Sequence, residues 1–141
     1  MNGRHQQQGR QQQENRPTNE LINRLRAPIT QLTDRDIFHP EGYARKVVEE
    51  LELQGVQLRR FYAELKNIQE MMKNKEDVKY RFYKLYALVN YQANRGVIKQ
   101  KFADLLTKML DNIERQDFSK QAVDRAVDLL MAMVAYSKKG G

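Results

Sequence analysis

Histidine and carboxylate side chains are the residues of this sequence that could perform acid–base or metal chemistry, but their spacing supports neither. The two histidines, His5 and His39, are far apart, and neither lies in an H-E-x-x-H helix or another metal-ligand pattern. The acidic pairs at positions 49–50 and 76–77 are adjacent, and adjacent helical residues do not face each other. There is no cysteine, no Gly-rich phosphate loop and no G-x-S-x-G elbow. We therefore expect no catalytic residue, no metal and no cofactor, and we expect the protein not to be an enzyme.

A stripe of basic and aromatic residues on an expected helix over residues 76–95 is the strongest candidate for binding chemistry. On a helical wheel at about 100° per residue, this stripe is separate from the apolar positions of the same helix. Its members are Arg81, Lys84, Tyr91 and Arg95. Arginine forks hold phosphate oxygens, and a tyrosine can stack on a base or donate its hydroxyl to a phosphate. The stripe therefore predicts binding to an RNA backbone with little reading of sequence. The alternative is a solvated face on which Tyr91 packs against a neighbouring helix.

The preceding expected helix carries a second basic series. Arg59, Lys66 and Lys73 are seven residues apart, so they align on one side of the helix, whereas Arg60 points elsewhere. This spacing is equally typical of a solvent face on which lysine stems cover apolar edges. The remaining tyrosines of the 76–95 helix are expected at the edge of the core or in a subunit interface: Tyr80, Tyr83 and Tyr86.

The charge of the chain favours a polyanionic partner. The chain has 25 basic and 18 acidic residues, a formal net charge of +7, and residues 61–100 alone hold eight basic and four acidic residues. Such a surplus favours nucleic acid first and an anionic membrane second. No apolar run approaches the roughly 20 residues that span a bilayer, and residues 1–17 lack the apolar stretch of a secretory signal. Together with the absence of cysteine, these features agree with a cytoplasmic protein that has no membrane partner.

Helical periodicity runs through the chain from residue 18 onward. No segment alternates apolar and polar residues for long enough to form a strand. We therefore expect an all-α fold, a compact bundle of about five main helices whose short connections make neighbours mostly antiparallel. A length of 141 residues fits a single helical-bundle domain, over residues 18–141. Residues 1–17 are rich in glutamine and poor in apolar side chains, so we expect a disordered arm there.

Capping residues, prolines and glycines mark the expected helix boundaries in the first half of the chain. Thr18 or Asn19 is expected to cap a short first helix, which ends before Pro28. Pro40 is expected to open the next helix in its first turn, and Gly55 to break the chain after it.

Similar signals divide the second half. Gly96 is expected to end the 76–95 helix, and Ser119 to cap the last helix. The last helix is apolar on more than one side, because Met131 and Met133 lie beyond its main stripe. Two readings remain open for it: a helix that docks into another subunit, or the central helix of a small bundle.

Three short blocks of the sequence fit one known family. They read VQLRRFYAEL at residues 56–65, LVNYQANRG at 88–96 and MAMVAYSKKGG at 131–141. In this order and spacing they resemble the small helical subunit of type III-A CRISPR–Cas effector complexes, the Csm complex. The similarity covers roughly residues 40–141.

The resemblance implies a non-catalytic small subunit of an RNA-guided effector in antiviral defence, in which other subunits cleave RNA and DNA. Copies would stack in a filament along the backbone subunits, beside the large subunit, and would contact the backbones of the guide RNA and target RNA. The residues at matching motif positions, implied to lie on or near RNA, are Gln57, Arg59, Tyr91 and Arg95. The helical wheel adds Lys66, Arg81 and Lys84. The alternative is a structural or adaptor bundle that binds only protein partners.

Overall fold

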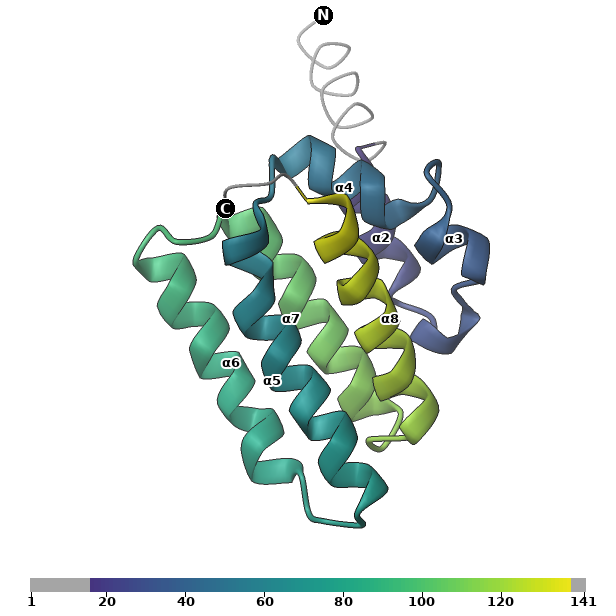
Figure 1. The fold of residues 1–141 in the computed structure, drawn as a ribbon, viewed down its shortest axis with the longest axis vertical. Helices are drawn as coiled ribbons and strands as arrows, with labels where there is room; N and C mark the ends of the chain where they lie inside the picture. The colour runs from purple at the N-terminus through teal and green to yellow at the C-terminus, as the bar shows by residue number, and fades with distance from the viewer. Residues whose placement is uncertain (1–15, 138–141) are drawn as a thin grey trace, which may run out of the picture.

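The structure, a computed structural model, describes residues 16–137 (Figure 1). Its helical elements are α2 (Pro17–Arg24), the 3-10 turn η1 (Ile29–Gln31), α3 (Asp34–Phe38), α4 (Tyr43–Leu51), α5 (Gly55–Lys73), α6 (Lys79–Asn94), α7 (Gln100–Arg115) and α8 (Lys120–Tyr136). No strand occurs in the described range. The all-α bundle with five main helices, α4 to α8, is thereby confirmed. Of the expected disordered arm, residues 1–15 lie outside the described residues.

Helix α8 lies at the centre of the bundle and α6 at its edge. Helix α8 packs against η1, α3, α4, α5 and α7, and eight of its residues are buried. Helix α6 packs mainly against α5 and α7, and only four of its residues are buried. In Figure 1 it forms the outer side of the bundle beside α5. Of the two readings of the last helix, the central one matches the described chain, with Met133 buried and Met131 exposed.

The apolar stripes expected from the helical period form the core. The largest buried side chains include Phe61 of α5, Phe82 of α6 and Phe102 of α7. Phe82 also meets Phe118, just before α8, edge to face with ring centroids 4.9 Å apart. Burying a side chain of this size contributes about 1.5–3 kcal/mol. The buried stripe of α6, continued by Leu85, therefore fixes which side of that helix faces outward.

The end of α6 follows the expectation from Gly96. This glycine has φ +72°, in the left-handed region that a side chain disfavours. Its N–H donates to the Ala93 carbonyl at 3.0 Å, and the Val97 N–H donates to the Gln92 carbonyl at 2.9 Å. This pair of bonds is a Schellman motif, which satisfies carbonyl groups that the end of a helix otherwise leaves open.

Of the two expected N-terminal caps, one is confirmed and one is wrong. The Ser119 hydroxyl caps α8, accepting from the backbone N–H three residues on at 3.2 Å. Helix α2, in contrast, begins at Pro17 rather than after a cap at Thr18 or Asn19, because the fixed φ of proline suits the first helical position. Thr18 is buried, and both its N–H and its hydroxyl donate to the Glu50 carboxylate of α4 instead.

The expectation that Pro40 opens a helix is also wrong. A short helix, α3, ends before it, and a reciprocal capping box between Thr33 and Asp36 starts that helix. Pro40 lies in the following turn, and α4 begins three residues after it. The turn is tight, because a Cβ atom on Gly42 would lie 2.5 Å from two carbonyl oxygens of α3.

Gly55 does not break the chain as expected, because it is the first residue of α5. The reversal occurs earlier, at Glu52, whose φ of 52° places it in the left-handed region. Gln54 and Gln57 then form a capping box that opens α5. The sequence signal of Gly55 therefore marks the start of a helix rather than a gap between helices.

Candidate nucleic-acid interface

The outer side of α6 carries a row of exposed basic and aromatic residues, which we call the α6 basic face. It consists of Tyr80, Arg81, Lys84, Tyr91 and Arg95, all of which are exposed. The sequence of α6 contains no aspartate or glutamate. The four residues expected from the helical wheel therefore lie on one exposed side, as predicted, and Tyr80 joins them.

Two cation–π pairs connect side chains of this face. The Lys84 Nζ atom lies 5.2 Å from the centroid of the Tyr80 ring, and the Arg95 Cζ atom lies 5.2 Å from that of Tyr91. Each pair joins residues four apart, which are neighbours on a helix surface. The two tyrosines are eleven residues apart, close to three turns, so both pairs point in nearly the same direction. Tyr80 is 78% exposed and Tyr91 55% exposed, so the rings remain open to a ligand.

Tyr80 is the most exposed tyrosine of α6 and lies outside the core, so of its two expected positions the core edge is wrong. The other expected position, a subunit interface, stays a prediction. The sequence did hold a signal for the exposure of Tyr80. Within α6 and its C-terminal cap, tyrosine followed four residues later by a cation occurs twice, at Tyr80/Lys84 and at Tyr91/Arg95.

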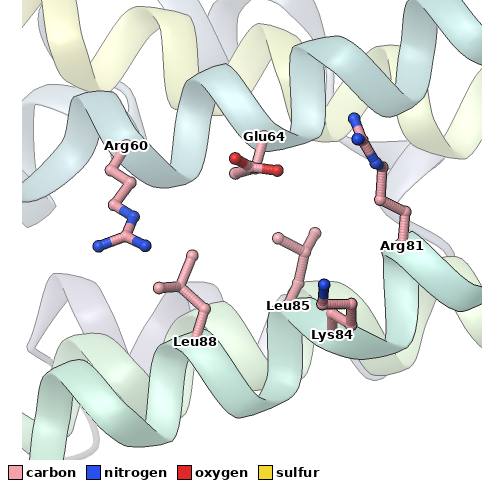
Figure 2. A pocket seen from close by; sticks show the side chains of 6 residues that line it. All are labelled: Arg60, Glu64, Arg81, Lys84, Leu85 and Leu88. Atoms are coloured by element: carbon pink, nitrogen blue, oxygen red, sulfur yellow. The ribbon is translucent and has the colours of Figure 1, made fainter.

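A pocket of about 260 Å³ between α5 and α6 adjoins this face (Figure 2). The residues that line it are Arg60, Glu64, Arg81, Lys84, Leu85 and Leu88. Figure 2 shows Arg60 and Glu64 projecting from α5 toward the leucines of α6. Within residues 16–137, the side chains of Arg60, Glu64 and Arg81 form no ion pair. Arg60 and Glu64 are site residues that the wheel of a single helix did not reveal.

The predicted contacts Arg59 and Lys66 do not join this pocket. On α5 they lie about 100° and about 120° around the helix axis from Arg60. Lys66 is exposed. The Arg59 guanidinium lies over the start of α5, where its Cζ atom is 3.5 Å from the position of a Cβ built on Gly55. The structure therefore separates these two cations from the α6 basic face.

Gln57 has a structural role at the same end of the bundle. Its Oε1 atom accepts from the Gln54 N–H at 2.8 Å, and its Nε2 atom donates to the Val97 carbonyl at 3.0 Å. The Ser137 hydroxyl is also next to Gly55, because it would lie 3.4 Å from a Cβ atom added to that glycine. The first sequence block thus meets the residue after the second block, and the residue just before the first block meets a residue of the third, so all three lie near one end of the bundle.

The other two tyrosines of α6 face α7. The Tyr83 hydroxyl donates to Glu114 and the Tyr86 hydroxyl to Asp111, both at 2.7 Å. The bond to Glu114 raises the pKa of Tyr83, and burial together with the bond to Asp111 raises the pKa of Tyr86. Both rings pack beside Phe82, which agrees with the expected place at the core edge.

The described part of the chain shows neither a membrane-spanning helix nor a metal-binding cluster. Between residues 16 and 137 no helix is both long enough and apolar enough to cross a membrane. In the same range no group of three or more histidine, cysteine, aspartate or glutamate residues is placed to hold a metal ion.

Comparison with known proteins identifies the family. A sequence profile of the family described as Csm2 Type III-A matches residues 34–141, which is most of the chain and includes all three sequence blocks. The search of curated proteins and the search of solved structures found no significant match. The match confirms the resemblance to the small Csm subunit, and the chain therefore belongs to the Csm2 family, the small subunit of type III-A CRISPR effector complexes.

Proposed function

We propose that this small subunit binds RNA through the α6 basic face and the adjoining α5–α6 pocket, without reading base sequence. The proposed ligand is the backbone of the guide RNA and of the target RNA in the effector complex. Phosphate oxygens would meet the cations of α6, and nucleobases would stack on Tyr91 and Tyr80. Contacts of this kind position a strand but carry little information about its sequence.

One observation carries the proposal: no cation of the α6 basic face forms an ion pair within residues 16–137, and two of them, Lys84 and Arg95, lie over tyrosine rings. Elsewhere in the described chain some exposed cations pair with acids, as Arg45 does with Glu49 at 2.9 Å, whereas others, such as Lys46 and Lys66, form no ion pair. On α6, Lys84 and Arg95 lie over tyrosine rings, and Arg81 forms no ion pair within residues 16–137. If this face served only solubility, carboxylates one turn from each cation would stabilise the helix through ion pairs. A run of unneutralised cations beside exposed rings suits a nucleic-acid strand.

The remaining predicted residues fit the proposal in different ways. Arg59 is proposed as a second phosphate contact, at the end of the bundle near which the three sequence blocks lie. Both polar atoms of the Gln57 amide already have partners, so we propose that Gln57 acts by holding that end in shape. Lys66 lies on another side of α5 and would reach only RNA that passes along that side.

The proposal extends to the assembly. We propose that copies of the protein stack in a filament along the backbone subunits and beside the large subunit, as a non-catalytic component of cytoplasmic antiviral defence. The apolar side chains Val56 and Val97 are 60% and 46% exposed. They lie close to the Gln57–Val97 bond, and a neighbouring subunit at this end of the bundle would cover them.

Fluorescence anisotropy with labelled single-stranded RNA tests the RNA-binding proposal. The full chain is titrated against two RNAs of unrelated sequence over a series of salt concentrations. We expect similar affinities for both RNAs and a steep loss of affinity with salt. Arg81→Ala and Arg95→Ala should each weaken binding to both RNAs and lower the log–log salt slope by about 0.7. Arg45→Ala is the matched control, because it removes the same charge from a residue that is already paired.

Two outcomes would reject the proposal. If Arg81→Ala and Arg95→Ala bind RNA as the parent does, with circular dichroism showing an intact fold, the α6 basic face is not the interface. If gentle purification of the tagged protein from its host recovers protein partners and no RNA, the adaptor alternative replaces RNA binding.

A further inference from the structure

Glu64 is the one acidic residue among the side chains that line the α5–α6 pocket. It shares the pocket with the cations Arg60, Arg81 and Lys84 but forms no ion pair with them. It is half-buried and lines the pocket. A carboxylate beside a proposed phosphate site needs a chemical explanation, since it repels phosphate.

The hydrogen-bonding capacity of a carboxylate limits what it can recognise. An ionised carboxylate only accepts hydrogen bonds, and phosphate oxygens also only accept them. The groups of an RNA strand that donate are the ribose 2′-hydroxyl and the N–H groups of the bases. The hydroxyl is present at every nucleotide, so a contact with it agrees with binding that does not depend on sequence.

The order of groups along the pocket favours the ribose. In Figure 2, Glu64 lies between the guanidinium groups of Arg60 and Arg81, with Leu85 and Leu88 below. Cation, acceptor, cation is the order that complements phosphate, ribose, phosphate in an RNA strand. The leucine side chains offer an apolar surface for the carbons of the sugar.

We propose that Glu64 accepts a hydrogen bond from a ribose 2′-hydroxyl and so makes the α5–α6 pocket select RNA over DNA. The inference rests on the proposed RNA-binding function and adds the chemical class of strand that the site accepts. DNA lacks the donor, so it leaves the Glu64 carboxylate unpaired next to phosphate. The preference therefore arises from one hydrogen bond gained with RNA and from repulsion that DNA does not relieve.

The test compares three oligonucleotides of one sequence: RNA, DNA and RNA with 2′-O-methyl groups, which keep the oxygen but lack the donor. Binding to the full chain is measured by anisotropy at one low salt concentration. The parent protein should bind RNA about tenfold more tightly than either of the other strands. Glu64→Ala should bind all three strands with similar affinity, mainly because DNA and 2′-O-methyl RNA bind better. Glu70→Ala is the matched control, because it removes a carboxylate from α5 that pairs with Lys73 and does not line the pocket.

The outcomes separate this inference from the function on which it rests. A parent protein that binds none of the strands overturns the proposed function and this inference together. A parent that binds RNA, with a preference over DNA that Glu64→Ala leaves unchanged, overturns only the role of Glu64. Equal affinity of the parent for RNA and 2′-O-methyl RNA would also overturn it, because the carboxylate would then recognise no ribose hydroxyl.

Discussion

Asn112 of α7 holds the N-terminal segment onto the bundle, and its replacement by alanine is expected to destabilise the fold strongly. The residue is 1% exposed. Its Oδ1 atom accepts from the Ile29 N–H at 2.8 Å. Its Nδ2 atom donates to the carbonyl oxygens of Leu25 and Ala27, at 2.7 and 2.8 Å. One side-chain amide thereby pairs with three backbone groups of residues 25–29, which lead from α2 into η1.

The size of the effect follows from which backbone groups lose their partner. In Asn112→Ala the Leu25 carbonyl keeps a hydrogen bond, because the Arg115 side chain also donates to it at 2.8 Å. The Ile29 N–H and the Ala27 carbonyl lose the bonds that Asn112 makes to them. A buried group left unpaired costs about 1–3 kcal/mol, and Ala27 is half-buried, where water reaches more easily. We therefore expect a loss of about 2–4 kcal/mol in the free energy of unfolding.

Urea unfolding followed by far-UV circular dichroism measures this loss. Asn90→Ala is the matched control, because Asn90 is exposed and donates one hydrogen bond within its own helix. That control should stay within about 0.5 kcal/mol of the parent. Asn112→Asp keeps the shape of the side chain but replaces its donors by acceptors that face two carbonyls, so it should be at least as harmful as alanine. An Asn112→Ala protein with the same stability and the same denaturant slope as the parent would refute the reasoning.

Three further predictions concern glycine geometry, alkaline stability and base stacking. Gly96→Ala should cost about 1 kcal/mol from its positive φ alone, whereas Gly42→Ala should cost more, because its Cβ would lie 2.5 Å from two carbonyl oxygens. The pKa of Tyr86 is raised by burial and by Asp111, so the stability that it contributes is present below about pH 10 and is lost as the pH rises further. Tyr91→Ala should weaken RNA binding about tenfold, whereas Tyr91→Phe should bind as the parent does.

Each of these predictions has a clear contradicting result. Urea unfolding in which Gly42→Ala is as stable as Gly96→Ala would show that the turn before α4 relaxes at no cost. Unfolding free energies of the parent and of Tyr86→Phe that fall equally above about pH 10 would remove Tyr86 as the cause. Equal loss of RNA affinity in Tyr91→Phe and Tyr91→Ala would show that the hydroxyl matters rather than the ring.

The fold was predictable where local sequence determines it. The helical stripes, the end of α6 at Gly96 and the cap at Ser119 depend on residues within a turn or two, and the structure has them as expected. Of the wrong expectations, the one at Gly55 overlooked a local signal, the capping box of Gln54 and Gln57, and the other two involve contacts with other segments. Thr18 lies inside α2, which starts at Pro17, and its hydrogen bonds go to Glu50, 32 residues away. Pro40 does not open a helix because the chain turns back onto α3 first.

The candidate site was likewise predictable only in part. A wheel of one helix was sufficient to place Arg81, Lys84, Tyr91 and Arg95 on one exposed side. The pocket beside them depends on the register in which α5 packs against α6, and one helix contains no information about that register. Arg60 and Glu64 were therefore missed, although their spacing of four residues puts them on one side of α5.

The edge position of α6 has a consequence for the dynamics of the protein. A helix with few buried side chains and only two main neighbours opens at a lower free energy than a central one. In native-state hydrogen exchange, the amides of α6 should therefore lose their protection before those of α8, which buries eight residues. The surface proposed to meet RNA therefore lies on a helix that should open more readily than the central one. A bound strand should then slow exchange along α6 more than along α8.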